Sequence, residues 1–328
     1  MKYLVIILLL VWFHGCGNNA HGPLAYVSNE RDGTITVIDT STDAVVNTFQ
    51  LGARPRGLRL SRDLKTLWVA ISYPTNQSQG EDKIVRIDAE TGAVLQKCDA
   101  GTDPENFVID SNATKLYVAN EDAGTASIID LAANRIVATM PVGLEPEGAA
   151  MSPDGRWVYI TSESSSSVSV IDTSTNQIVK TFLVGARPRE AIFSSDGKMA
   201  YVSAENGSSV SVVDTANHEV MKTLVLPKRE GTTQLKPKGM ALSKDNRWLY
   251  VATGRGNCIA VVDLNSGEVT NLITVGQRPW GLSITEDGKK LYAANGVSND
   301  VSVIDVDRNQ VVKTIKAGDG PWGVAIQP

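Results

Sequence analysis

Residues 143–181 read GLEPEGAAMSPDGRWVYITSESSSSVSVIDTSTNQIVKT, and this stretch predicts four short β-strands in succession. A first apolar run ends in Ser152–Gly155, whose proline, aspartate and glycine suit a tight turn. Trp157–Thr161 is rich in aromatic and β-branched residues, which favour strands. Val168–Asp172 alternates apolar and polar residues, and Gln177–Thr181 follows one more turn. Four strands in about 40 residues are typical of one blade of a β-propeller.

The same pattern recurs along the 328 residues, so the chain is a repeat protein. The aromatic residue of the second strand returns at spacings of 42 or 49 residues, at Tyr26, Trp68, Tyr117, Tyr159, Tyr201, Tyr250 and Tyr292. A proline precedes the first strand, at Pro55, Pro104, Pro146, Pro188, Pro237, Pro279 and Pro321, and it closes a Gly-x-x-Pro motif in every unit but one, where Gln234 replaces the glycine. Both landmarks occur seven times, which predicts seven blades in a single ring.

The two ends of the propeller region complement one another. The first unit, residues 24–50, has strands two to four but lacks a first strand, whereas the chain ends in Pro321–Ile326, a first strand alone. The sequence therefore predicts an all-β, seven-bladed β-propeller with four antiparallel strands per blade, in which the C-terminal strand closes the first blade. We assign residues 1–16 to a signal peptide, 17–23 to a short linker and 24–328 to the propeller.

The N-terminus has the features of an export signal. Lys2 precedes an apolar run over Tyr3–Phe13, which is too short for a transmembrane helix. Cys16 resembles the lipid-acceptor cysteine of bacterial lipoproteins, so lipidation at Cys16 and simple cleavage nearby both stay open; a lipid would be the only membrane contact. Cys98 and Cys258 fall four repeats apart, and we expect both to be buried free thiols.

Two seven-residue insertions distinguish one face of the ring. They fall within residues 72–82, between strands two and three of one blade, and within residues 226–236, between a fourth strand and the next first strand. In antiparallel blades both connections emerge on the face that carries the proline loops. Insertions that gather on one face indicate a binding face.

The residues that flank the prolines should surround the mouth of the central channel on that face. They are Arg54, Arg56, Asp103, Glu105, Glu145, Glu147, Arg187, Arg189, Lys236, Lys238, Arg278, Trp280 and Trp322, with Gly320 completing the set. Seven basic side chains face four carboxylates, which predicts a site for an anionic or quinone-like ligand or for a partner protein. The alternative is that neighbouring arginines and glutamates only neutralise one another as salt bridges.

Several other functions find little material in the sequence. A net charge of −5 without basic blocks argues against nucleic acid as a partner. His21 and His218 are the only histidines after the signal region, too few for a zinc site or a Ser-His-Asp triad, and we expect His218 to be exposed. We assign no catalytic residue, no metal ligand and no cofactor, although a charged propeller mouth can be catalytic. The aspartate that closes each third strand is expected to cap the following turn, at Asp39, Asp88, Asp130, Asp172, Asp214, Asp263 and Asp305.

Short motifs suggest a family. Tyr117–Asn120 (YVAN) resembles the motif that names the YVTN β-propellers, and Asp103–Glu105, Glu145–Gly148, Asn295–Asp305 and Pro321–Val324 are similar to fragments of the PQQ-dependent catabolism-associated β-propeller proteins. The resemblance covers essentially the whole chain from Ala25. It implies export to the periplasm and an association with quinoprotein alcohol oxidation, but it supplies no catalytic residues.

We therefore expect a non-enzymatic, monomeric accessory propeller that binds a ligand or partner at the channel mouth. A periplasmic quinoprotein dehydrogenase and a small anionic ligand are the expected partners. One alternative is a lactonase-like hydrolase that depends on Glu105 or Glu147. Another is a cell-envelope interaction protein that is lipid-anchored through Cys16.

Overall fold

A computed structural model describes residues 22–73, 82–231 and 234–328. The predicted signal peptide, Cys16 and most of the first insertion lie outside the described residues. Within the described ranges, no helix has the length and apolarity needed to cross a bilayer.

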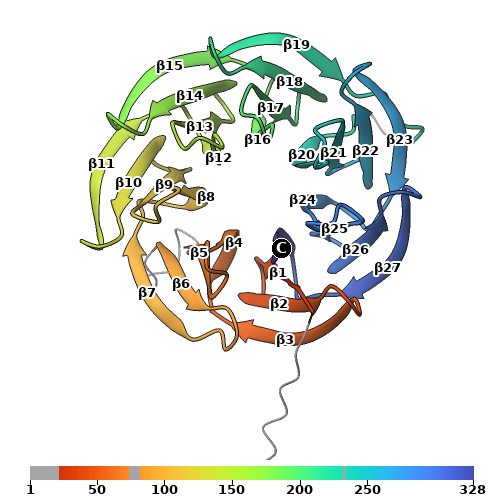
Figure 1. Cartoon of the computed structure of the whole chain (residues 1–328), viewed down its shortest axis with the longest axis horizontal. Coiled ribbons are helices and arrows are strands. Elements are labelled where there is room, and N and C mark those ends of the chain that lie inside the picture. Colours follow the sequence, from red (N-terminus) through yellow and green to blue (C-terminus); the bar gives the residue numbers. More distant parts are fainter. Residues whose placement is uncertain (1–21, 74–81, 232–233) are drawn as a thin grey trace, which may run out of the picture.

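The described residues form 28 strands in seven four-stranded sheets, arranged as a ring with first strands innermost and fourth strands outermost (Figure 1). The first strands are β4 (Arg54–Leu60), β8 (Pro104–Ile109), β12 (Pro146–Met151), β16 (Pro188–Phe193), β20 (Pro237–Leu242), β24 (Pro279–Ile284) and β28 (Pro321–Ile326). The second strands are β1 (Leu24–Asn29), β5 (Thr66–Ser72), β9 (Lys115–Asn120), β13 (Trp157–Ser162), β17 (Met199–Ala204), β21 (Trp248–Thr253) and β25 (Lys290–Asn295).

The outer half of each sheet repeats in the same way. The third strands are β2 (Thr34–Asp39), β6 (Lys83–Asp88), β10 (Thr125–Asp130), β14 (Ser167–Asp172), β18 (Ser209–Asp214), β22 (Cys258–Asp263) and β26 (Asp300–Asp305). The fourth strands are β3 (Ala44–Gln50), β7 (Val94–Asp99), β11 (Arg135–Pro141), β15 (Gln177–Leu183), β19 (Glu219–Val225), β23 (Glu268–Thr274) and β27 (Gln310–Lys316). We number the blades from blade 1, which contains β1, to blade 7, which ends with β27.

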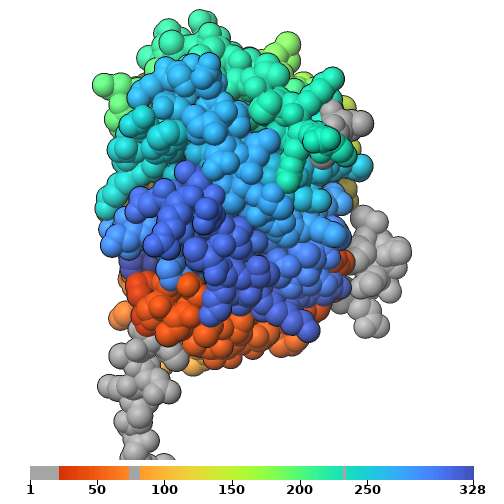
Figure 2. Space-filling model, turned by 90° about the vertical axis from the view of Figure 1, so that its right-hand side faces the viewer, coloured from red at the N-terminus to blue at the C-terminus, as the bar shows by residue number. Residues whose placement is uncertain are grey.

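Blade 1 is built from both ends of the propeller. Its sheet has the order β28-β1-β2-β3, and Tyr26 pairs with Ala325 in antiparallel register. Figure 2 shows the orange N-terminal blade packed directly against the blue C-terminal residues. The predicted fold class and the closure of the first blade by the C-terminal strand are therefore confirmed.

The core lies between adjacent blades and depends on the repeated aromatic residue. All seven of these side chains are buried. The hydroxyl of Tyr26 in blade 1 donates to the carbonyl of Ala89 in blade 2 at 3.0 Å, so the ring also joins neighbouring blades through a polar contact. Such buried aromatic rings contribute much of the apolar area of a core.

His218 departs from its expected exposure. Its side chain is buried, with the ring edge of Trp157 at a centroid distance of 4.7 Å and a 2.7 Å hydrogen bond between Nδ1 and the hydroxyl of Tyr159. His218 lies in a turn of blade 5, and this turn packs against blade 4. Turns are usually exposed, so the sequence alone did not reveal this contact between blades. The prediction of an exposed His218 is wrong.

The aspartates of the third strands play the structural role that the sequence indicates. Asp39 accepts the backbone N–H groups of Ser41 and Thr42 at 2.8 and 3.2 Å. Its bond from the Ser41 hydroxyl is the main reason why the pKa of Asp39 falls to about 2. The aspartates of the other six blades accept equivalent N–H groups. Cys98 and Cys258 are buried free thiols, as expected.

Candidate functional site

The proline loops bring two chain segments together at the channel mouth, which is the end of the channel where the first strands begin. In most blades the residue before the proline has a left-handed backbone, as in Asp103 with φ of 51° and Arg187 with φ of 59°. Its carbonyl accepts the N–H of the residue that follows the second strand: Glu121 donates to Asp103 at 3.0 Å and Glu205 to Arg187 at 2.8 Å. The end of each second strand therefore lies beside the proline loop.

Four glutamates that the sequence analysis missed reach the mouth through this contact. They are Glu30, Glu121, Glu163 and Glu205, which follow the second strands of blades 1, 3, 4 and 5. Each comes four residues after the repeated aromatic, in YVSNE, YVANE, YITSE and YVSAE. A glutamate at this fixed spacing in four repeats is the sequence signal that could have identified them. With the four predicted carboxylates they make eight acidic side chains against seven basic ones. The expected excess of basic residues at the mouth is therefore wrong.

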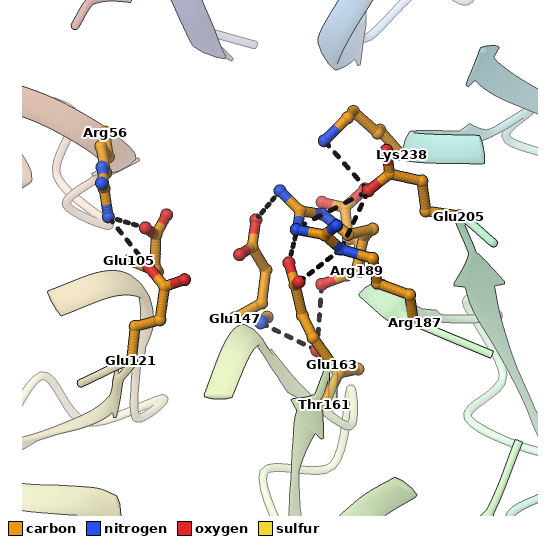
Figure 3. Close-up of polar contacts among 12 residues, drawn as sticks. Arg56, Glu105, Glu121, Glu147, Thr161, Glu163, Arg187, Arg189, Glu205 and Lys238 are labelled. Carbon is orange, nitrogen blue, oxygen red and sulfur yellow. Dashed lines mark hydrogen bonds and ion pairs between the residues drawn. The ribbon is translucent and has the colours of Figure 1, made fainter. Parts of the chain in front are cut away.

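One group of charges, the Arg56 cluster, spans blades 1 to 3 and comprises Arg54, Arg56, Glu30, Asp103, Glu105 and Glu121. The buried guanidinium of Arg56 pairs with Glu105 and lies 3.1 Å from Glu30 and 3.2 Å from Asp103 (Figure 3 shows the part around Arg56, Glu105 and Glu121). Arg54 pairs with the same oxygen of Glu30 at 2.6 Å. Two guanidinium groups thus face four carboxyls, which leaves this cluster short of positive charge.

A second group, the Arg189 cluster, spans blades 4 to 6 and comprises Arg187, Arg189, Lys238, Glu147, Glu163 and Glu205 (Figure 3). Buried Arg189 pairs with Glu163 and lies 2.7 Å from Glu147 and 3.7 Å from Glu205. Arg187, whose side chain is 45% exposed, also pairs with Glu163 at 2.5 Å. Three cations face three carboxylates here, so the cluster is balanced.

Glu121 is a carboxyl of the mouth with unusual protonation. Its burial and the nearby charge of Glu147 raise its pKa to about 7, and the attraction of Arg56 only partly opposes them. Its side chain is still 26% exposed and lies 3.6 Å from the guanidinium of Arg56. At neutral pH this carboxyl can therefore accept or donate a proton at a position that water reaches.

The other side of the mouth is a basic edge formed by Lys236, Arg278, Trp280 and Trp322. The guanidinium of Arg278 lies 4.9 Å from the centre of the Trp280 ring, which stacks on Trp322 at 6.2 Å. Among the described residues, no carboxylate lies within ion-pair distance of Lys236 or Arg278. The position that holds glutamate in four blades is Gly296 in blade 7, where a Cβ atom would lie 2.7 Å from the Trp280 ring. Glycine therefore makes room for this tryptophan.

Lys238 connects the basic edge to the Arg189 cluster. Its buried ammonium lies 3.3 Å from the centre of the Trp280 ring and 3.5 Å from Glu205. Burial and the positive charge of Arg189 hold the pKa of Lys238 well below its usual value. A cavity of about 50 Å³ is bordered by Glu147, Arg189, Lys238, Trp280 and Trp322, among others. Only one substituent of a ligand fits in it.

Three carboxyls of the Arg56 cluster lie close enough together to resemble the ligands of a metal site. Oxygens of Asp103, Glu105 and Glu121 lie within 4.8 Å of one another. The guanidinium of Arg56 contacts all three and already supplies positive charge. These side chains could hold a cation only if that guanidinium moved away.

The structure places all thirteen predicted site residues at the channel mouth. The residues after the prolines point inward: five are buried, and Trp280 and Trp322 are half-buried. Before the prolines, Arg54, Asp103 and Arg187 join the two clusters. Glu145 instead accepts a 2.5 Å bond from the Ser164 hydroxyl, and Lys236 contacts Asn206. Salt bridges thus account for much of the charge, as one alternative expected, but not for the basic edge. The binding role of these residues stays a prediction.

Two family models match the chain. The model of the choice-of-anchor I domain matches residues 23–192, just over half of the chain. The model of the lactonase family, described as a seven-bladed β-propeller, matches residues 179–319.

Curated relatives align over short segments. The uncharacterized protein YncE of Salmonella typhimurium is 38% identical over 66 residues, which is 19% of each protein. Antigen Lp49 of Leptospira interrogans is 25% identical over 118 residues, which is 36% of this chain and 26% of the antigen. The chain thus matches only about a fifth to a quarter of the length of these relatives.

Solved structures are similar over nearly the whole chain. A Bacteroides uniformis protein provisionally described as a 6-phosphogluconolactonase has a TM-score of 0.78 at 20% identity and covers 94% of this chain and 100% of its own. The Pseudomonas aeruginosa periplasmic gluconolactonase PpgL has a TM-score of 0.78 at 18% identity, with 93% and 99% covered. Kuenenia stuttgartiensis hydrazine synthase reaches 0.73 at 21% identity, with 85% and 91% covered. At these identities the similarity shows the fold alone.

Proposed function

Because this chain belongs to the choice-of-anchor I domain family, and its later blades match the lactonase family, we propose that it hydrolyses small anionic lactones at the channel mouth. The lactonase descriptions of two structural neighbours support the reaction class. Fold similarity alone does not determine the reaction, so the proposal depends on the chemistry of the mouth.

The observation that carries the proposal is the Glu121 carboxyl, with its pKa of about 7 and its access to water. Lactone hydrolysis adds water across the ester C–O bond. The carboxylate takes a proton from the attacking water, and the resulting carboxylic acid returns it to the ring oxygen as that bond breaks. A group whose pKa is near the working pH suits both steps. Arg56, 3.6 Å away, would stabilise the negative charge on the carbonyl oxygen.

This assignment changes the carboxylate expected for the reaction. The sequence points to Glu105 or Glu147, but Glu105 pairs with Arg56, and Glu147 pairs with Arg189 at 2.7 Å. A carboxylate whose oxygens are held by a guanidinium has fewer lone pairs free for the proton of an attacking water, whereas Glu121 lies farther from Arg56, at 3.6 Å. Glu121 is the better candidate.

The basic edge supports an anionic substrate. Lys236 and Arg278 have no carboxylate partner among the described residues, so a phosphate or carboxylate on the substrate would provide one. The half-buried ring of Trp322 offers an apolar face for the sugar. These features favour a phosphorylated sugar lactone over a neutral one.

The test compares hydrolysis of 6-phosphogluconolactone and gluconolactone by the purified protein, each corrected for the uncatalysed rate. We expect kcat/KM to be at least about tenfold higher for the phosphorylated lactone, as a charged contact implies. Arg278→Met should remove this preference and leave the rate on gluconolactone unchanged. Arg135→Met, at an exposed arginine of an outer strand, is the matched control.

Two results would overturn the proposal in different ways. Binding of 6-phosphogluconate without turnover of either lactone would reject the hydrolase and leave a binding protein. Neither binding nor turnover would reject the channel mouth as a site for such ligands.

A second candidate function is the accessory binding role in a PQQ-dependent alcohol-oxidation system, in the periplasm. It is favoured by the fact that Arg56 and Arg189, the two buried arginines of the mouth, are both held by carboxylates. A rigid charged mouth of this kind suits recognition without chemistry. The two functions are compatible as successive steps: oxidation of a cyclic hemiacetal produces a lactone, and a lactonase then hydrolyses that lactone. Co-purification of a quinoprotein dehydrogenase with the native protein would support the accessory role.

A further inference from the structure

Two charged side chains inside the channel depart from the repeat. The second residue after the proline is glycine in five blades, but it is Asn106 in blade 3 and Glu190 in blade 5. The fourth residue after the proline is uncharged in every blade except blade 2, where it is Arg59. Neither Glu190 nor Arg59 belongs to the clusters at the mouth.

Glu190 lies where the channel is narrow. At the equivalent position of blade 6, a Cβ on Gly239 would collide with the carbonyl oxygen of Trp280, so adjacent first strands approach closely at this level. The carboxylate of Glu190 accepts the N–H of Met240 at 2.5 Å. Glu190 borders both the small cavity at the mouth and a second cavity on its other side. It therefore separates two compartments of the channel.

The second compartment, which we call the lower cavity, has a volume of about 340 Å³. Residues of β4, β8, β12 and β16 line it, and most are apolar, including Leu60, Val108, Met151 and Phe193. The volume falls within the usual range for small-molecule sites, about 300–1,000 Å³. The cavity is large enough for a ligand of the size of a benzene ring with one substituent.

Arg59 is the one cation among the residues that line this cavity. One of its terminal nitrogens donates to the carbonyl of Leu58 at 2.8 Å, and no carboxylate of the described chain lies within ion-pair distance. Burial raises the pKa of Glu190 to about 7 although Arg59 opposes it, so Glu190 is only partly ionised at neutral pH. The guanidinium therefore has hydrogen-bond donors and positive charge left for a ligand.

We propose that the lower cavity is a second binding site, which takes a monocarboxylate with a small apolar body and binds its carboxylate to Arg59. A guanidinium matches a carboxylate through two parallel hydrogen bonds. The apolar lining accommodates a hydrocarbon chain or ring but penalises any further charge. A dianion such as a phosphate monoester would carry one charge without a partner, so the lower cavity selects a different ligand from the mouth.

The experiment measures binding of benzoate and of its neutral analogue benzamide to the whole protein by isothermal titration calorimetry. Wild-type protein should bind benzoate at least tenfold more tightly than benzamide. Arg59→Met, which keeps the apolar stem, should weaken benzoate binding at least tenfold and leave benzamide unchanged. Arg62→Met is the matched control, since Arg62 is exposed in the turn after β4 and should leave both affinities unchanged.

Competition distinguishes this site from the channel mouth. Saturating 6-phosphogluconate should leave benzoate binding unchanged, whereas displacement of benzoate would move the site to the mouth and overturn the inference. Equal affinity for benzoate and benzamide in the wild-type protein would also overturn it, and this measurement needs no variant to fold. The outcome is independent of lactone turnover, so it stands or falls separately from the proposed hydrolase.

Discussion

Replacing Glu121 by glutamine is expected to lower kcat/KM for 6-phosphogluconolactone by about 100- to 10,000-fold, the usual contribution of a general base. The amide keeps the size and hydrogen bonding of the side chain but cannot take a proton from water. The side chain of Glu121 is partly exposed, and Arg56 only partly neutralises its charge, since the same guanidinium also contacts other carboxylates. Replacing Glu121 should therefore not destabilise the protein. The rate is measured with the uncatalysed hydrolysis subtracted.

The matched control for this variant is Glu268→Gln, at an exposed glutamate of the outer strand β23. It should retain the wild-type rate. A Glu121→Gln protein with wild-type turnover would show that another group activates the water. If that variant regained turnover only at high pH, hydroxide would be attacking the lactone directly, because hydroxide needs no general base.

Replacing Arg189 by methionine should destabilise the protein by about 3–5 kcal/mol, the cost of leaving buried charges without their partner. Arg189 pairs with Glu163 and with Glu147, and both carboxylates are buried. Methionine fills a similar volume without charge. For a chain of this length the loss corresponds to a fall in Tm of about 4–7 °C.

Arg187→Met provides the comparison within the same cluster. Arg187 also pairs with Glu163, at 2.5 Å, but its side chain is 45% exposed. We expect a loss below about 1 kcal/mol, since water screens an exposed pair. The double variant Arg189→Met/Glu163→Gln should recover part of the lost stability. Equal Tm values for Arg187→Met and Arg189→Met would contradict the view that Arg189 neutralises the buried carboxylates.

The fold could be predicted almost completely from the sequence, because each landmark is a local requirement that recurs in every blade. The aspartates cap their own turns, and Pro321–Ile326 completes a blade that visibly lacks a first strand. Local hydrogen bonds and strand pairing of this kind leave a direct trace in the sequence. The position of the thirteen mouth residues follows from the same repeat.

The pairing of charges at the mouth could not be predicted, because it connects different blades. Arg56 of blade 2 contacts Glu30 of blade 1 and Glu121 of blade 3, which are separated from it by 26 and 65 residues. Which side chains meet depends on the curvature of the ring and on the left-handed backbone before most of the prolines. His218 illustrates the same limit, since its burial comes from a neighbouring blade.

The most useful departures are those in which one or two blades differ from the rest. Glycine replaces glutamate at positions 254 and 296, and at 296 it makes room for a tryptophan at the mouth. Arg59 stands where the other six blades have uncharged residues. Residues that all blades share serve the fold. Residues at which individual blades depart from the repeat are the candidates for function.

The most direct test of the account is the pH dependence of kcat/KM for hydrolysis of 6-phosphogluconolactone by the wild-type protein. The base acts as a carboxylate, so the rate should rise about tenfold per pH unit below an apparent pKa near 7 and level off above it. This rise should be absent in Glu121→Gln. A flat profile through neutral pH, or no turnover above the uncatalysed rate, would contradict the proposal that Glu121 catalyses lactone hydrolysis at the channel mouth.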